Sequence, residues 1–300
     1  MKTALITGAS RGIGEATAYQ LAKEYDCVAI MSRNTDGKLN AVANQIHTTT
    51  NCECIPFTGD VSDFAFVEDC VRSLATSGHP VDTLVNNAGI SLVGLFQDMT
   101  PEEFDRILRI NVTSVYNTCH AVIPDMVRNQ RGRILNISSV WGLVGASCEV
   151  AYSATKGAIN SLTMALAKEL APSHIAVNAI AFGAVDTTMN GHLSVEEKKA
   201  LCEEIPAEKM AAPEEAARKY SILFNILLTQ VFDCCCKLDW ISVTQCRTPE
   251  DFTADHTHKR NRNIQNDRRY DDLPCLHMSH RHTRKHGAVR AKRQEGCLLY

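Results

Sequence analysis

The sequence predicts an α/β protein built on a doubly wound parallel sheet. Over about the first 212 residues, short apolar runs alternate with amphipathic stretches. This alternation is typical of strand–helix–strand units whose parallel sheet is covered on both faces. A glycine-rich turn joins the first apolar run to the first amphipathic stretch. Right-handed crossovers between the strands then give the doubly wound arrangement.

The expected strands and helices follow one another in alternation. The strands are the apolar runs at residues 3–7, 28–32, 53–58, 83–86, 132–138 and 176–181. The helices are the stretches with helical apolar spacing at residues 12–25, 38–48, 63–76, 101–129, 151–171 and 194–204. We expect residues 1–217 to form this single domain. Residues 218–300 are predicted to be an atypical, poorly ordered tail, because Arg, His, Asp and Asn dominate residues 251–293 without apolar periodicity.

Composition and charge argue against a membrane protein and against a nucleic-acid-binding protein. The chain is 45% hydrophobic with a formal net charge of −3, so no general attraction to nucleic acid is implied. The longest apolar run, residues 222–232, is shorter than the roughly 20 residues of a membrane span. The first strand begins too early to leave room for a signal or transit peptide. We therefore expect a cytoplasmic protein without membrane or nucleic-acid partners.

The glycine-rich turn at residues 7–14 has the character of a dinucleotide-binding loop in a Rossmann-like fold. Glycine lets the backbone approach a pyrophosphate, and a helix N-terminus offers unpaired N–H donors. The spacing is Gly-x-x-x-Gly-x-Gly rather than the commoner Gly-x-Gly-x-x-Gly. The prediction therefore depends on the strand–turn–helix context, without which the run is an ordinary turn. The loop residues expected to contact the cofactor are Gly8, Ser10, Arg11, Gly12, Ile13 and Gly14.

The end of the second strand favours NADP(H). An acidic residue at this place would accept a hydrogen bond from the ribose 2′-hydroxyl of NAD. The chain has Arg33 there, whose guanidinium can pair with the 2′-phosphate of NADP, and Arg11 adds a second charge. The alternative is that Arg33 is a solvated loop charge and that Asp36 binds the ribose.

Tyr152 and Lys156 stand one helical turn apart, which puts a phenol and an ammonium on one helix face. A nearby cation lowers the pKa of a phenol, so we expect Lys156 to lower the pKa of Tyr152. Tyr152 would then protonate a ketone oxygen as hydride reaches the carbon. Ser139 ends the fifth strand at the carboxyl edge of the sheet, where its hydroxyl can stabilise the carbonyl oxygen. Either motif alone occurs often by chance; the glycine loop ahead of them gives the combination its weight.

Together these motifs resemble those of the short-chain dehydrogenases/reductases. The resemblance covers residues 1 to about 217 and rests on residues 7–14, 60–61, 86–89, Asn111, Ser139, and the Tyr152 and Lys156 pair. It implies a catalytic tetrad of Asn111, Ser139, Tyr152 and Lys156. In that tetrad Asn111 would hold a water that relays protons to Lys156.

The same resemblance implies further contacts to NADP(H). Asp60 and Val61 would flank the adenine, and Asn87, Ala88 and Gly89 would line the cofactor at the fourth strand. Val185 and Thr187 would contact the nicotinamide carboxamide. The full set of expected cofactor contacts beyond the glycine loop is Arg33, Asp60, Val61, Asn87, Ala88, Gly89, Tyr152, Lys156, Val185 and Thr187.

Within the family, the chain resembles the 3-oxoacyl-[acyl-carrier-protein] reductases of fatty acid biosynthesis. Residues 140–152 resemble more closely the elongation factor P 5-aminopentanone reductases. The implied activity is NADPH-dependent reduction of a ketone to a secondary alcohol. The ketone would be carrier-bound, a small molecule, or the 5-aminopentanonyl-lysine of elongation factor P. Glu149 either attracts an amine-bearing substrate or is a solvated loop acid.

Two departures from the family pattern affect these expectations. Phe182 stands where the family has proline before Gly183, so we expect a looser loop over the nicotinamide. No Asp-Gly-Gly turn follows Pro213, so the last strand is expected to be missing or replaced. That makes the family's homo-oligomer doubtful here, and the alternative function is a catalytically impaired cofactor-binding remnant. The His and Cys spacing of the tail does not match a zinc site, so no metal is expected.

Overall fold

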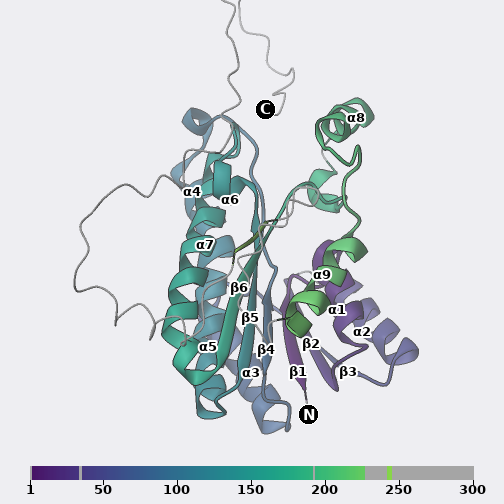
Figure 1. Ribbon diagram of the computed structural model, residues 1–300, viewed down its shortest axis with the longest axis vertical. Helices are drawn as coiled ribbons and strands as arrows, with labels where there is room; N and C mark the ends of the chain where they lie inside the picture. Colours follow the sequence, from purple (N-terminus) through teal and green to yellow (C-terminus); the bar gives the residue numbers. More distant parts are fainter. Residues whose placement is uncertain (1, 34–35, 192, 227–241, 245–300) are drawn as a thin grey trace, which may run out of the picture. The chain divides into compact units, whose positions relative to one another are not determined.

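The computed structural model describes residues 2–33, 36–191, 193–226 and 242–244, all within one compact unit (Figure 1). Its centre is a seven-stranded sheet of order β3-β2-β1-β4-β5-β6-β7. The first six strands are parallel to one another, which confirms the predicted fold class. They are β1 (Thr3–Thr7), β2 (Cys27–Ser32), β3 (Glu53–Thr58), β4 (Thr83–Asn86), β5 (Gly132–Ser139) and β6 (Ile175–Phe182). Each lies within one residue of its expected bounds at either end.

Helices cover both faces of this sheet (Figure 1). One face carries α1 (Gly12–Leu21), α2 (Lys38–Thr49) and α9 (Pro213–Ile226), and the other carries α3 (Phe64–Thr76), α5 (Ser114–Arg128) and α7 (Val150–Leu170). Successive strand residues point to opposite faces. Ile6 therefore joins Leu21 in one buried apolar cluster, whereas its neighbour Leu5 joins Val122 in the other. The shorter elements are η1 (Phe96–Asp98), α4 (Pro101–Leu108), α6 (Trp141–Val144), η3 (Ala171–Ser173), η4 (Thr188–Asn190) and α8 (Val195–Glu204).

The long helix expected at residues 101–129 is interrupted by a π-helical turn. α4 begins with a capping box between Thr100 and Glu103, and α5 ends at Arg128. Between them, η2 (Arg109–Thr113) adds one residue to a turn. Such insertions are frequent at functional sites, and this one carries Asn111, which is 1% exposed.

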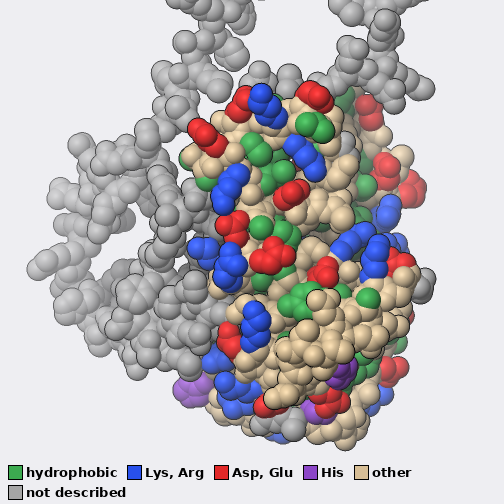
Figure 2. All heavy atoms as spheres, turned by 90° about the vertical axis from the view of Figure 1, so that its right-hand side faces the viewer, with side chains coloured by type: hydrophobic (Ala, Val, Ile, Leu, Met, Phe, Trp, Pro, Cys, Tyr) green, Lys and Arg blue, Asp and Glu red, His purple; other side chains and the backbone are tan. Residues whose placement is uncertain are grey.

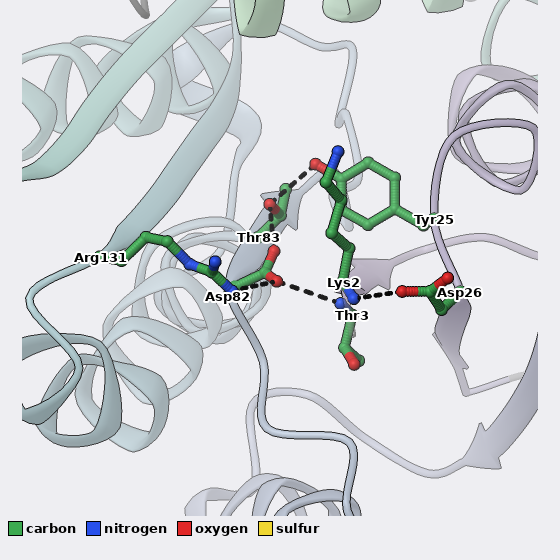
Figure 3. A network of polar contacts seen from close by, with 7 residues as sticks. All are labelled: Lys2, Thr3, Tyr25, Asp26, Asp82, Thr83 and Arg131. Atoms are coloured by element: carbon green, nitrogen blue, oxygen red, sulfur yellow. Dashed lines mark hydrogen bonds and ion pairs between the residues drawn. The ribbon is translucent and has the colours of Figure 1, made fainter.

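A polar network lies at the amino-terminal ends of the central strands, opposite the glycine loop (Figure 3). The Asp82 carboxylate accepts hydrogen bonds from the Thr3 amide at 3.3 Å and the Thr83 hydroxyl at 2.9 Å. Arg131 approaches the same carboxylate at 3.3 Å, and the Tyr25 hydroxyl lies 2.9 Å from that of Thr83. Burial raises the pKa of Asp82 above its ordinary value, in spite of these hydrogen bonds and the arginine. The network thus joins the starts of β1 and β4 to the turn before β5.

The region after β6 departs from a simple continuation of the parallel sheet. The expected replacement of the last strand is found: β7 (Ser242–Thr244) pairs antiparallel to β6, with Ala179 opposite Thr244. α9 packs on α1 and crosses the predicted boundary at residue 217. That boundary and the poorly ordered tail stay predictions, because most of the residues concerned lie outside the described ones. In the described residues no helix is long and apolar enough to cross a membrane.

Candidate active site

The glycine loop between β1 and α1 is shaped so that only glycine fits at its contact points. Gly8 and Gly12 adopt left-handed backbone angles, with φ of +67° and +60°. A Cβ atom on Gly14 would lie 2.3 Å from the carbonyl oxygen of Gly8 and 2.5 Å from Nδ2 of Asn87. The residue before α1, Arg11, provides no side-chain cap. The first N–H groups of this helix are therefore available to a pyrophosphate, and the loop fits a dinucleotide.

Asn87 braces this loop from the segment after β4. Its Nδ2 donates to the carbonyl oxygens of Thr7 and Gly8, both at 3.1 Å. The Thr7 hydroxyl in turn accepts from the amides of Asn87 and Ala88, both at 3.0 Å. Two loops from neighbouring strands are thereby held together at the carboxyl edge of the sheet. The side chain of Asn87, expected to line the cofactor, acts in this structure as the connection between the loops.

The residues expected around the adenosine lie beyond the ends of β2 and β3. Arg33 is exposed, and Ser10 is buried, where it accepts a hydrogen bond of 2.9 Å from the Ser32 hydroxyl. Asp60 accepts from both the amide and the hydroxyl of Ser62, at 2.9 and 2.8 Å. Partial burial opposes ionisation of Asp60, but these hydrogen bonds, with charge from Arg33 and Arg109, hold its pKa below the ordinary value.

Val61, Val185 and Thr187 occupy the loops on either side. Val61 is buried, and its carbonyl oxygen accepts from Asn117 at 3.1 Å. Val185 is buried beside Ala211, to which it is joined by an isolated bridge. A Cβ atom on Gly12 would lie 3.3 Å from the methyl group of Thr187, so the loop after β6 faces the glycine loop. The structure thus brings the predicted cofactor residues to one edge of the sheet.

Ser139, Tyr152 and Lys156 lie together at the end of β5. Ser139 is its last residue and forms a side-chain hydrogen bond with Tyr152 of α7. Lys156, one turn further on α7, is 6% exposed and donates from Nζ to the carbonyl oxygen of Ile137 at 2.7 Å. Its Nζ is 5.6 Å from the centroid of the Tyr152 ring. The pairing predicted from the sequence is therefore present in three dimensions.

The expected effect of Lys156 on its neighbour is wrong for this structure. Burial raises the pKa of Tyr152 to about 12, and the Glu149 carboxylate adds to the rise, while the hydrogen bond with Ser139 opposes it. Burial also lowers the pKa of Lys156 to about 8. Desolvation of the phenolate outweighs the attraction of an ammonium that is bound to the Ile137 carbonyl. Tyr152 is consequently protonated at neutral pH, which suits a proton donor.

Asn111 reaches the same place from η2, and its side-chain amide is hydrogen-bonded within the protein. Oδ1 accepts from the Ile90 amide at 2.8 Å, while Nδ2 donates to the Ile90 carbonyl at 2.9 Å and to the Thr155 hydroxyl at 3.1 Å. Both N–H donors of the amide are thereby occupied. The predicted water relay is left untested, and the side chain itself braces the site. A Cβ atom on Gly89 would meet Asn111 Oδ1 at 3.3 Å and Lys156 Nζ at 3.8 Å.

Thr155 is a site residue that the sequence reasoning missed. Its side chain is fully buried, and its hydroxyl donates to the carbonyl oxygen of Tyr152 at 2.7 Å while accepting from Asn111. It therefore links η2 to the helix that carries the tyrosine and lysine. The sequence offered one sign of this role, a hydroxyl residue directly before Lys156. Only the structure shows that this hydroxyl is hydrogen-bonded to Asn111.

Phe182, where family members have proline, is held in place by other means. Its carbonyl oxygen accepts from the Val140 amide at 2.9 Å, and it pairs with Ser139 in the sheet. Its ring is 3% exposed and lies 6.1 Å from that of Tyr220, edge to face. Strand pairing and core packing thus restrain Phe182 without a proline ring. The expected looseness of the loop beyond it remains a prediction.

Comparisons with known proteins match this chain to one family of enzymes. Residues 2–198 match the family model described as short chain dehydrogenase. The chain is 38% identical over 226 residues to "Uncharacterized oxidoreductase YmfI" of Bacillus subtilis, covering 75% of this chain and 91% of the relative. It is 34% identical over 222 residues to the 3-oxoacyl-[acyl-carrier-protein] reductase FabG of a Staphylococcus epidermidis strain, covering 74% and 91%.

Solved structures show the same relationship. A 3-oxoacyl-[acyl-carrier protein] reductase from Brucella melitensis superposes with a TM-score of 0.68 at 34% identity, covering 74% of this chain and 84% of the other. A 3-oxoacyl (acyl-carrier-protein) reductase from Agrobacterium tumefaciens, solved with NADP bound, gives 0.67 at 29% identity, covering 73% and 85%. The family match, the fold and the grouped site residues together identify this chain as a member of the short-chain dehydrogenase/reductase family of oxidoreductases.

Proposed function

We propose that this chain catalyses the NADPH-dependent reduction of a ketone to a secondary alcohol, as a 3-oxoacyl-[acyl-carrier-protein] reductase does. The observation that carries the proposal is the grouping of Ser139, Tyr152 and Lys156 beside a glycine loop that fits a dinucleotide. The names of the Staphylococcus relatives and the NADP in the Agrobacterium structure support it. The residues that would hold the cofactor are those of the glycine loop, Arg33, Asp60, Val61, Asn87, Ala88, Gly89, Tyr152, Lys156, Val185 and Thr187.

Each site side chain has a task that follows from its state. When bound, NADPH supplies the hydride for the carbonyl carbon. Tyr152, whose pKa is raised to about 12, is protonated and donates its phenolic proton to the carbonyl oxygen. The Ser139 hydroxyl donates to that oxygen and stabilises its developing charge. Lys156 keeps two N–H donors beyond the one bound to Ile137, which would serve the nicotinamide ribose and return a proton to Tyr152.

The finer substrate proposal concerns Glu149, three residues before Tyr152. Its carboxylate accepts a hydrogen bond from the Ser91 hydroxyl at 3.2 Å and is close enough to raise the pKa of Tyr152. A carboxylate at this place favours a ketone that carries an amine, of which the 5-aminopentanonyl-lysine of elongation factor P is one. We expect Glu149→Gln to lower kcat/KM for an amine-bearing ketone more than for acetoacetyl thioester. An equal loss on both ketones would leave the acyl thioester as the better substrate class.

The test of the main proposal is Tyr152→Phe, with exposed Tyr116→Phe on α5 as the matched control. With acetoacetyl thioester and NADPH followed by absorbance, Tyr152→Phe should lower kcat at least about 100-fold, because the general acid is lost. The Kd for NADPH, measured by fluorescence, should stay within about twofold. Wild-type turnover by Tyr152→Phe would overturn the mechanism. A wild-type protein that binds NADPH but reduces no ketone would instead support the impaired remnant.

A further inference from the structure

The short helix α6 follows Ser139 and packs on α7, the helix that carries Tyr152 and Lys156. None of the four residues of α6 is buried. In the middle of α6, the Gly142 carbonyl oxygen accepts a hydrogen bond of 3.1 Å from Nδ2 of Asn160 on α7. We infer that Asn160 is a positioning residue for ketone reduction, which holds α6 so that the Ser139 hydroxyl faces the carbonyl oxygen of the substrate. This inference rests on the proposed function, because it concerns the same reaction.

The first residue of α6 determines how the Ser139 hydroxyl is used. The Trp141 amide donates to Oγ of Ser139 at 3.2 Å. A serine hydroxyl has a single proton to donate, so an N–H group can approach its oxygen only at a lone pair. The Ser139 proton is therefore directed away from Trp141, on the side of Tyr152, with which Ser139 forms a side-chain hydrogen bond. A shift of Trp141 relative to Tyr152 would change this direction.

Burial of apolar side chains does not hold α6 in place. Leu143 and Val144 are 49% and 75% exposed. The backbones of the two helices do come close, since a Cβ atom on Gly142 would lie 2.6 Å from the carbonyl carbon of Lys156. Such a contact limits the distance between α6 and α7 but not the position of one along the other. A hydrogen bond is directional and fixes that position, which is the task we assign to Asn160.

Other hydrogen bonds hold the residues on either side of α6. The Val140 amide donates to the Phe182 carbonyl oxygen at 2.9 Å, and the Ala146 amide donates to the Ser153 hydroxyl at 3.1 Å. Loss of the Asn160 side chain should therefore let α6 move without releasing the whole segment. A moderate loss of rate is expected, rather than an inactive protein.

The hydrogen bonding of Asn160 is incomplete, which argues against a purely stabilising role. The residue is 5% exposed, and among the residues that the structure describes its Oδ1 has no hydrogen-bond partner. An unpaired buried acceptor costs at least as much free energy as one hydrogen bond contributes. An apolar residue of similar size would thus be as stable at this place. An asparagine is explained if the position of α6 matters for the reaction.

The charged surface seen in Figure 2 is too mixed to direct the Ser139 hydroxyl. On this side of the unit, which carries α1, α2 and α9, Lys and Arg side chains are interspersed with Asp and Glu. Fields of opposite sign largely cancel, and salt screens them beyond about 10 Å. The groups that touch the hydroxyl therefore decide its direction, and Asn160 acts on one of them through α6.

The experiment measures steady-state kinetics on the full chain, with acetoacetyl thioester and NADPH. Asn160→Leu removes the donor at similar size, and Asn160→Ala removes it without added bulk. We expect each to lower kcat about fivefold, as for one lost hydrogen bond, with the Kd for NADPH within about twofold of wild type. The Tm of Asn160→Leu should not fall. The matched control on α7 is Thr163→Val, which removes the acceptor of a 2.9 Å hydrogen bond from Asn136 and should lower Tm without changing kcat.

A double-mutant cycle with Ser139→Ala separates positioning from a general structural effect. Without the hydroxyl that Asn160 directs, Asn160→Leu should lower kcat less than about twofold, because residues that act through one another are not additive. The same fivefold loss in both backgrounds would overturn the inference, as would wild-type kcat in both Asn160 variants or an equal loss in Thr163→Val. A wild-type chain that reduces no ketone would overturn the proposed function, and this inference with it. Turnover with an additive cycle would overturn the inference alone.

Discussion

Gly14→Ala tests the shape of the glycine loop directly. The new Cβ atom would lie 2.3 Å from the Gly8 carbonyl oxygen, whereas ordinary contacts begin near 3.4 Å. The Gly8 carbonyl would have to move by about 1 Å, and it also accepts the hydrogen bond from Asn87. Overpacking of this kind costs about 1–3 kcal/mol, and a weakened hydrogen bond costs about 1 kcal/mol more. We therefore expect the free energy of unfolding to fall by about 2–4 kcal/mol.

Two measurements follow from that estimate. At about 2–4 °C per kcal/mol for a domain of this size, Tm should fall by about 4–16 °C. The Kd for NADPH should rise at least about tenfold, because the displaced carbonyl narrows the loop where the pyrophosphate approaches. Gly94→Ala is the matched control, since no atom lies within 4 Å of its added Cβ. A Gly14→Ala protein with the Tm and NADPH affinity of the wild type would refute the reasoning.

Three further predictions concern single hydrogen bonds and charges. Thr155→Val should lower kcat about tenfold with KM for NADPH unchanged, because Asn111 loses a partner worth roughly 1–2 kcal/mol. Thr155→Ser should restore the rate, and a Thr155→Ser protein as slow as Thr155→Val would refute the link. Glu149→Gln should lower the pKa of Tyr152, so alcohol oxidation, which needs the phenolate, should accelerate at lower pH than in the wild type. A pH–rate profile that does not move would contradict this. Burial raises the pKa of Asp82 in the folded state, so the folded state binds the proton more readily than the unfolded state. The free energy of unfolding of the wild type, relative to that of Asp82→Asn, should therefore increase as pH falls toward 3.8. A difference between the two proteins that does not change with pH in chemical unfolding would argue against this.

The first two strands of the sheet could be predicted because they are runs of mostly apolar residues buried on both faces. Every residue of Thr3–Thr7 and Cys27–Ser32 is buried, and the apolar runs bounded by the glycine-rich turn and the amphipathic stretches sufficed to find both strands. The glycine loop and the Tyr152 and Lys156 pair could also be recognised in the sequence, because each motif consists of residues that are close together along the chain. The sequence therefore predicted which residues gather at the site.

What sequence reasoning missed depends on contacts between distant segments. The pKa of Tyr152 rises because the fold buries it and places Glu149 nearby, neither of which can be derived from a lysine four residues away. The hydrogen bond between Asn111 and Thr155 joins two helical segments that are far apart in the sequence. The direction of β7 was equally beyond reach, because strand direction in a sheet is decided by the path of the chain.

The π-helical turn η2 makes the active site sensitive to helix length. Residues 101–128 form one continuous helical segment, and the single extra residue in η2 sets the angular relation between α4 and α5. Deleting one residue from 109–113 would let an ordinary α-helical turn form, which would remove the widened turn that carries Asn111. Asn111 could then no longer face Ile90 and Thr155 together. Insertions and deletions in this segment should therefore lower activity more than most substitutions do, and engineered variants should keep the length of the segment unchanged.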